Sequence, residues 1–411
     1  MGYGSAFLRF WWDKTTRDTF LDCLPKDDLV NFRRACHDFS VRGAPVLFRD
    51  VQVTFRMGTF TRPARMAALE RIGHHIRTLT FKMEHTSETF LPPLLDPVTG
   101  EERVYVYEPS VNNPSPISRH KRPKYGSWEM SDMLIKQYNP LFHAATNIPA
   151  FIRAFKAMRD IEHLKISCPG QEPAQRYRRC SVDYALISLR IAVERAPLTN
   201  LTTLSLLPIH PAGVFYLRAM PGFGTLPNSA KRWGQIKKLA IHMDGWSFES
   251  RNGATDHLRF LHDFLAGFSA NLERLFFRWK GVKGPCPFTL DSEPIFRTDR
   301  REKPKRTRFK RLKQMELKNS VLDASQIDSF IRRHRRTLRE FDFSEASLRS
   351  GTWDDALAYL SRMSGSDNWK KNQVIEVPTT PISDGRPMGE ELYFGSPQHM
   401  KEFLRNSVYV K

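Results

Sequence analysis

The sequence predicts an α/β protein in which an N-terminal helical module precedes a solenoid of helix-and-strand units with a parallel, curved sheet. A short apolar pattern, seen in Ile161–Ile166 (IEHLKI), recurs seven times in the 411 residues. Amphipathic helical segments precede most copies by a few residues. Short strands that alternate with helices favour parallel pairing, and a roughly constant period favours stacked units over a doubly wound sheet.

The pattern by itself is weak, because roughly 25 chance matches are expected in a chain of this length and composition. The preceding helical segments make it informative. The copies begin at Ile76, Ile161, Leu201, Ile236, Leu272, Leu312 and Leu338, and the last six are 40, 35, 36, 40 and 26 residues apart. The predicted helices span 66–75, 151–158, 184–194, 256–268 and 327–334. An ordinary α/β domain is the alternative interpretation.

Residues 10–50 follow a different pattern and predict a small helical module. Phe20–Phe39 contains two amphipathic segments separated at Pro25, and Asp27 is expected to cap the second helix. The apolar side chains of that helix fall on one stripe, formed by Leu29, Phe32, Ala35, Cys36 and Phe39. A module of about 40 residues cannot bury a large core, so we expect it to pack on a neighbour or a partner.

The repeat region is expected to span 51–365, with a C-terminal extension at 366–411. Two loop insertions interrupt it, at about 84–126 and 280–311. The first is rich in proline and asparagine and predicts a largely disordered excursion, with a short strand at 104–107.

Positive charge is concentrated in the second insertion. The net charge is +20, and Arg297 to Arg339 contains 16 Lys and Arg against 5 acidic residues. The run from 297 to 313 predicts a nuclear-import signal or a patch for an anionic partner, and a surface insertion that only aids solubility is the alternative. The residues assigned to the import signal are Lys303, Lys305, Arg306, Arg308, Lys310 and Arg311.

Several classes of function find no support. The five cysteines lack paired spacing, which favours a reducing compartment, and no apolar run or signal-peptide pattern predicts a membrane span or secretion. Motifs for phosphate-binding loops, zinc proteases, serine hydrolases and zinc sites are missing from the sequence. We therefore expect no catalytic residues, no metal and no cofactor, and a cytoplasmic or nuclear location, or both.

The N-terminal module resembles an F-box. The resemblance lies in Leu24–Leu29 (LPKDDL), Arg33–Phe39 (RRACHDF) and Ala44–Arg49 (APVLFR), which are similar to its second and third helices. The units behind it resemble the leucine-rich repeats that follow F-boxes in large families of filamentous fungi, although they exceed the usual 20 to 29 residues and lack the regular asparagine. The first F-box helix departs from the family pattern, because its Leu-Pro-acid positions fall on Trp12, Asp13 and Thr15.

The resemblance implies a substrate receptor of a cullin-based ubiquitin ligase. In that family the F-box binds a Skp-type adaptor and the repeat domain presents a protein client. The positions that the resemblance places at the adaptor surface or in the module core are Leu24, Pro25, Leu29, Ala35, Cys36, Phe39, Leu47 and Phe48. A core-only role for these residues is the alternative.

Alternation of side chains along a strand predicts which residues face a client. The residues beside the second and third apolar positions are expected on the concave surface of the sheet. Those assigned to client binding are Lys165, Lys238, His242, Arg274, Phe276 and Arg278. An aromatic ring between arginines fits an acidic partner, and the alternative for Phe276 is that a loop covers it.

Two further functions compete with the receptor interpretation. One is a leucine-rich repeat scaffold without a link to the ligase. The other is a nucleic-acid binder that uses the basic run. Binding of single-stranded nucleic acid favours aromatic residues between the charges, and only Phe309 lies within 297–313.

Overall fold

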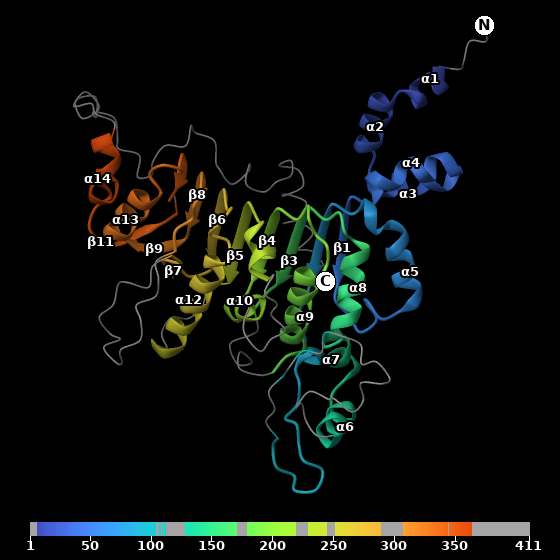
Figure 1. Ribbon diagram of the computed structural model, residues 1–411, viewed down its shortest axis with the longest axis horizontal. Coiled ribbons are helices and arrows are strands. Elements are labelled where there is room, and N and C mark those ends of the chain that lie inside the picture. The colour runs from blue at the N-terminus through green and yellow to red at the C-terminus, as the bar shows by residue number, and fades with distance from the viewer. Residues whose placement is uncertain are drawn as a thin grey trace.

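A parallel sheet of eight strands dominates the computed structural model, which describes residues 6–103, 107, 109, 111, 128–170, 179–218, 229–244, 251–288, 307–343 and 345–363 (Figure 1). Its order is β1-β2-β3-β4-β5-β6-β8-β10. The strands are β1 (Asp50–Thr54), β2 (Thr78–Lys82), β3 (His163–Cys168), β4 (Thr203–Ile209), β5 (Lys238–Asp244), β6 (Arg274–Lys280), β8 (Gln314–Lys318) and β10 (Glu340–Asp342). All seven repeated segments form strands, and each strand begins two residues after the first apolar residue of its segment.

The predicted parallel pairing in one sheet is confirmed, and its register follows from the apolar pattern. The second apolar residues of neighbouring segments are paired, as in Leu164 with Leu204 and Leu204 with Leu239. The third apolar residues form a parallel row two positions further on, as in Leu206 with Ile241. Because side chains alternate along a strand, both rows point to the same face of the sheet.

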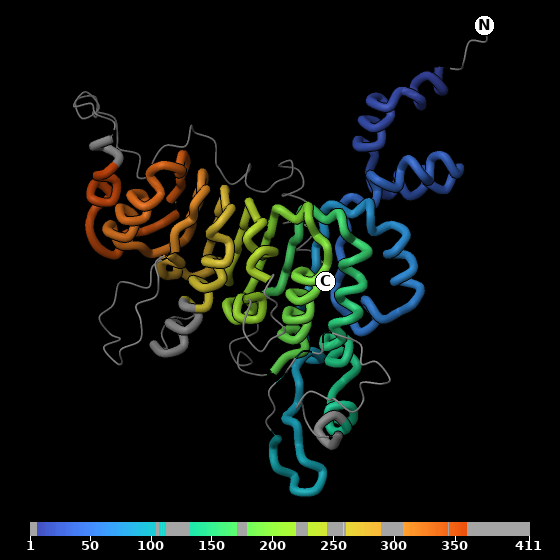
Figure 2. Tube along the Cα trace, in the orientation of Figure 1, coloured from blue at the N-terminus to red at the C-terminus, as the bar shows by residue number. Residues whose placement is uncertain are grey.

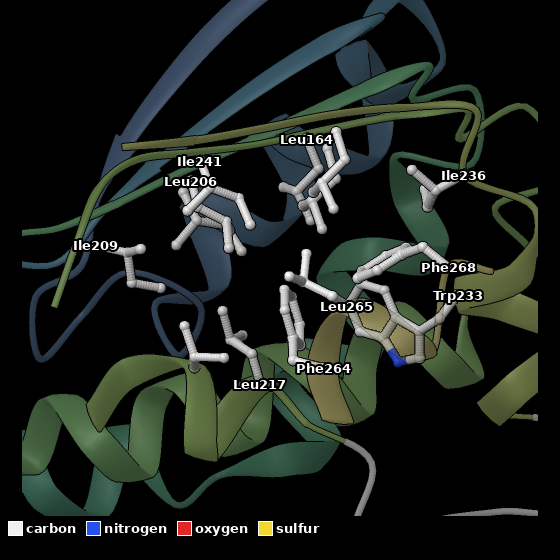
Figure 3. Close-up of a cluster of buried hydrophobic side chains, with 14 of the residues drawn as sticks. Leu164, Leu206, Ile209, Leu217, Trp233, Ile236, Ile241, Phe264, Leu265 and Phe268 are labelled. Atoms are coloured by element: carbon white, nitrogen blue, oxygen red, sulfur yellow. The ribbon is translucent and has the colours of Figure 1, made fainter. Parts of the chain in front are cut away.

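Helices cover that apolar face (Figure 1). Along the sheet they are α5 (Pro63–Ile72), α8 (Ile148–Ala157), α9 (Ser181–Arg195), α10 (Pro211–Leu217) and α12 (Arg251–Ala266), with the shorter α11 (Ser229–Gly234) and the 3-10 turn η1 (Gly73–His75). Figure 3 shows Leu206 and Ile241 facing Leu217, Phe264 and Leu265 across the core. Burial of this apolar layer, at about 25 cal/mol per Å² removed from water, is what holds the units together.

A second, smaller sheet was not predicted. It has the order β11-β9-β7 and contains β7 (Gly284–Pro285), β9 (Ser320–Asp323) and β11 (Ser347–Ser350), next to α13 (Ala324–His334) and α14 (Trp353–Met363). Glycine is required at position 284, because a Cβ there would lie 2.5 Å from the ring of Trp279. The Trp279 Nε1–H donates to the Pro285 carbonyl at 3.0 Å, which fixes this turn against β6.

The prediction of a largely disordered first insertion is wrong for residues 84–103. Leu91 and Leu94 are buried with side chains of α6 (Trp128–Gln137) and α7 (Pro140–Ala145), and Gln137 Oε1 accepts a hydrogen bond from the Leu95 N–H at 2.9 Å. The 3-10 turn η2 (Ser87–Thr89) begins this segment, which lies beside α6 below the sheet (Figure 2). Most of the expected strand at 104–107 lies outside the described residues, as do 289–306 and 364–411.

Four helices form the N-terminal module, at the β1 end of the sheet (Figure 1). They are α1 (Ala6–Trp12), α2 (Lys14–Cys23), α3 (Lys26–Ala35) and α4 (His37–Leu47). The break at Pro25 is confirmed, but the predicted cap at Asp27 is wrong: Asp27 lies in the first turn of α3, and Pro25 occupies the N-cap position. Lys26 Nζ donates to the Asp50 carbonyl at 3.0 Å and so links the module to β1.

Candidate functional site

The N-terminal module has a small aromatic core. Trp11, Leu21 and Leu29 are buried, and the rings of Phe32 and Phe39 stack with centroids 4.2 Å apart. Trp11 packs against Phe39 at 4.7 Å, and its Nε1–H donates to Asp38. This bond and the neighbouring Arg42 guanidinium lower the pKa of the Asp38 carboxyl. The module therefore has its own packing, although it is small.

Large apolar side chains are exposed on this module. Trp12 is 64% exposed, Val41 56% and Phe7 51%, and Leu8, Phe20 and Val30 are exposed as well. The corresponding exposed residues elsewhere in the described part of the chain are Met57, Leu95, Val98, Ile135 and Val282, which are spread over four segments. All six of these exposed apolar residues of the module lie within 35 positions of one another in the sequence. Exposed apolar patches are typical of protein-binding surfaces.

The structure separates the predicted adaptor residues into three groups by burial. Leu29 lies in the module core, so its role there is packing. Pro25, Ala35 and Cys36 are exposed. Leu24, Phe39, Leu47 and Phe48 are half-buried, and the Arg33 guanidinium covers the Phe48 ring at 4.7 Å. Trp12 and Val41 are the most exposed large apolar residues of the module. The sequence did not identify them as adaptor-binding residues, because they do not match the F-box pattern.

Two of the positions that differ from the F-box pattern, Trp12 and Asp13, have local structural roles. Asp13 is the N-cap of α2, and its side chain accepts a hydrogen bond from the Thr16 N–H at 2.7 Å. Hydrogen bonding with the Thr16 side chain, together with the bond from its N–H, lowers the pKa of the Asp13 carboxyl. Trp12 projects from the end of α1 and lies under the Arg42 guanidinium, 5.0 Å from the ring centroid.

The sheet face that points away from the helices carries polar side chains in rows. The paired strands align Thr78, His163, Thr203, Lys238, Arg274, Gln314 and Glu340 in one row. The next row contains Thr80, Lys165, Ser205, Ala240, Phe276, Glu316 and Asp342. The order of the strands thus brings together residues from the whole repeat region.

Two basic residues lie side by side in the first row. Lys238 pairs with Arg274 on the adjacent strand, and both are half-buried. Burial and the neighbouring Arg274 lower the pKa of the Lys238 ammonium, although Glu273 opposes this shift. Like charges opposite each other destabilise a sheet, so a bound anion at this position would relieve the repulsion.

Phe276 differs from its predicted role. Its side chain is 2% exposed and packs on Ala240 and on the His242 ring, whose centroid is 5.1 Å away. Phe276 therefore does not present an exposed aromatic anchor. Burial, together with the positive charges of Arg278, Lys280 and Lys318, lowers the pKa of His242 to about 3, so this imidazole is neutral at physiological pH.

The remaining charged residues of this face are largely paired. Arg278 is exposed and forms an ion pair with Glu345 at 3.1 Å. Lys318 lies 2.7 Å from the buried Glu316. Lys165 is half-buried, and burial lowers its pKa. The His163 Nε2 lies within hydrogen-bonding distance of Ser205 Oγ, at 2.8 Å.

The structure also gathers three potential metal ligands that sequence spacing did not predict. His85, Cys168 and His210 lie at the ends of successive strands, and their ligand atoms are all within 4.8 Å of one another. The sequence predicted no metal site because it has no closely spaced His and Cys residues. Spacing along the chain cannot reveal ligands that come from the ends of separate strands.

Comparison of the chain with family models and with curated proteins finds no match. Among the described residues, no helix is both long enough and apolar enough to span a bilayer.

Proposed function

We propose that this chain is a non-catalytic substrate receptor of a Skp-cullin-F-box ubiquitin ligase. The N-terminal module would contact the adaptor and the sheet would present a protein client. The support for this proposal is the set of exposed apolar side chains on α1 to α4. A bound partner would remove the apolar surface of Trp12, Val41 and Phe7 from water.

We further propose that the module is F-box-like and that the repeat region is a leucine-rich-repeat-like solenoid with a curved sheet. The support is the order of the strands: each repeated segment pairs with the segments before and after it in the chain. Units that contact only their neighbours are the defining property of a solenoid. Client binding then falls to the polar rows, where residues of several units lie next to one another.

The client is proposed to carry negative charge at its contact site. The support is the neighbouring pair Lys238 and Arg274, whose repulsion an anionic group would offset. Arg278 lies four residues further along β6, on the same face, and is exposed. Phe276 would support the neighbouring side chains of β5 and would not itself contact the client.

The adaptor proposal is tested with the exposed predicted residues. The double substitution Ala35→Glu and Cys36→Glu should weaken binding of a purified Skp-type adaptor by about 10- to 100-fold, because charge then enters an apolar contact. Calorimetry with the full chain measures this affinity. Both side chains are exposed, so the fold should persist.

The matched control is Val282→Glu. Val282 is 71% exposed but lies outside the module, between β6 and β7, so its replacement should leave adaptor affinity unchanged. If the folded native chain binds no adaptor, the receptor proposal fails and the ligase-independent scaffold replaces it. Equal weakening by Val282→Glu would show that the effect is not specific to the module.

The basic run is proposed to direct the protein to the nucleus in part of the population, with the remainder in the cytoplasm. Lys303, Lys305 and Arg306 lie outside the described residues. Arg308, Lys310 and Arg311 are exposed, whereas Phe309 and Leu312 beside them are buried and hold the chain at the start of β8. Burial of Phe309 removes the aromatic residue that a nucleic-acid surface would use in this run.

A further inference from the structure

Three side chains meet where strands β2, β3 and β4 end. His85 follows β2 by three residues, Cys168 is the last residue of β3, and His210 directly follows β4. Parallel strands place their carboxyl ends at the same edge of a sheet, where ligand sites of such sheets are commonly found. The three ligand atoms lie within 4.8 Å of one another.

The His85 ring is oriented as a metal ligand. Its Nδ1 lies 2.8 Å from the Pro169 carbonyl oxygen, which can only accept, so Nδ1 carries the proton and Nε2 keeps its lone pair. His85 Nε2 is buried and has no hydrogen-bond partner within the described part of the chain. Imidazoles that bind metals commonly donate their other N–H to a carbonyl in this way.

Cys168 supplies a sulfur ligand that water does not reach. Its side chain is fully buried and the thiol is not in a disulfide. The thiol must lose its proton to bind a metal, and a bound divalent ion would stabilise the resulting thiolate.

His210 is also the N-cap of α10. Its Nδ1 accepts a hydrogen bond from the Gly213 N–H at 3.1 Å, so in the neutral ring the proton is on Nε2. Coordination through Nε2 moves the proton to Nδ1 and breaks the bond from Gly213. Metal binding should therefore perturb the start of α10.

We propose that His85, Cys168 and His210 bind a zinc-type divalent cation at this edge of the sheet. Two imidazoles and one thiolate suit Zn²⁺, which prefers nitrogen and sulfur ligands in tetrahedral geometry. Tetrahedral ligands at Zn–N and Zn–S bond lengths lie about 3.3 to 3.6 Å apart. The cluster must contract by about 1 Å at its widest separation, a movement within reach of side-chain rotation.

Asp244 lies on the β5 side of this cluster. It is the last residue of β5, and its Oδ2 accepts a hydrogen bond from the Gly170 N–H at 2.6 Å. A Cβ at Gly170 would lie 3.3 Å from this oxygen and 3.5 Å from the His210 Cβ, which places both residues beside the same turn. The carboxylate adds to the attraction for a cation, and three protein ligands leave the fourth coordination position open.

Such an ion would connect the first insertion to the sheet. His85 begins the segment that continues through Leu91 and Leu94 to the contacts with α6 and α7. The proposal does not depend on adaptor or client binding.

The test uses the full chain, stripped of metal with a chelator and titrated with Co²⁺ and then with Zn²⁺. Cobalt should produce a thiolate-to-metal charge-transfer absorption, which Zn²⁺ removes by displacement. Zinc should also raise the midpoint of thermal unfolding, because only the folded state assembles the ligands. The Gly213 amide resonance should shift on binding.

Cys168→Ser should abolish the charge-transfer band, and His85→Gln should weaken zinc binding on the order of 100-fold or more, since loss of an outer-shell partner alone costs 10- to 100-fold. Cys286→Ser is the matched control, because Cys286 is a buried free cysteine far from these strand ends and should leave the band intact. If Cys168→Ser fails to fold, His85→Gln tests the same site. Absence of the band in the native chain, or its persistence in folded Cys168→Ser, overturns the proposal.

Discussion

At the scale of single residues, the interior is not purely apolar, because Arg190 and Glu194 are both buried in it. They form an i,i+4 ion pair on α9, with an Nη1–Oε2 distance of 2.9 Å and side chains that are 0% and 1% exposed. Glu194 also accepts hydrogen bonds from Ser229 Oγ and Trp233 Nε1, both at 2.8 Å. This carboxylate therefore ties α9 to α11.

Glu194→Ala should lower the free energy of unfolding by about 3 to 5 kcal/mol, because it leaves the Arg190 charge buried without its carboxylate. Urea denaturation followed by circular dichroism measures the change. Asp328→Ala is the matched control. It removes the acidic partner of Arg332 in an i,i+4 ion pair on α13, and the Arg332 side chain is 50% exposed. The free energy of unfolding should therefore fall by less than about 0.5 kcal/mol.

His334 should make stability depend on pH. It is 2% exposed, its Nε2 accepts from the Phe309 N–H at 3.1 Å, and its Nδ1 donates to the Phe330 carbonyl at 2.9 Å. Burial lowers its pKa to about 4, with smaller contributions from Arg333 and Arg308, while the Phe330 bond opposes the shift. The neutral ring satisfies both bonds, and protonation at Nε2 breaks one of them.

The unfolded state, with a pKa near 6.5, binds this proton more readily than the folded state. Stability is therefore complete above pH 6.5 and falls as the pH drops toward 4, by at most about 1.4 kcal/mol per pH unit from this residue. His334→Gln should flatten the dependence of unfolding free energy on pH in that window. The exposed His74→Gln serves as the control, and an equal slope in native protein and His334→Gln would contradict the assignment.

At the scale of elements, the proposed adaptor contact can be tested at the junction between α1 and α2. The family pattern has Leu, Pro and an acid where this chain has Trp12, Asp13 and Thr15. In the structure Asp13 caps α2 and Trp12 is exposed, so these residues form a helical junction of their own.

Trp12→Leu, Asp13→Pro and Thr15→Glu, introduced together, should tighten adaptor binding by roughly 10-fold or more if the departure from the pattern weakens the contact. Calorimetry against the native chain measures the change. Loss of the Asp13 cap costs about 1 kcal/mol of helix stability, so helix content is compared first. Equal affinity of two folded proteins would show that this junction does not contact the adaptor.

At the scale of the whole molecule, the described end of the basic run and the N-terminal module lie towards opposite ends of the sheet. The module adjoins β1, and residues 307–313 lead into β8 (Figure 1). The proposed import signal and the proposed adaptor surface would therefore act independently.

Replacement of Lys303, Lys305, Arg306 and Arg308 by alanine should shift a fluorescent fusion from nucleus to cytoplasm. The reason is the loss of four of the charges that an import receptor would bind. Lys280→Ala and Lys283→Ala remove exposed charge outside the run and provide the control. An unchanged distribution would favour the interpretation that the run only aids solubility.

The sequence by itself determined the main sheet, because each repeated segment carries apolar residues at the same offsets and can bury them only beside a matching neighbour. The alternation along each strand also predicted which residues share the polar face. Tertiary structure alone decided which of these are accessible: Phe276 is buried although its position is on that face, and Leu29 is in the module core although the resemblance allowed a surface role.

Other features depend on contacts between distant segments, for which the sequence carries no local pattern. The packing of residues 84–103 requires side chains of α6 and α7. The meeting of His85, Cys168 and His210 requires three strands to end at one edge. Local spacing encodes helix and strand, whereas burial and ligand geometry arise only when strands from separate segments lie side by side in the sheet.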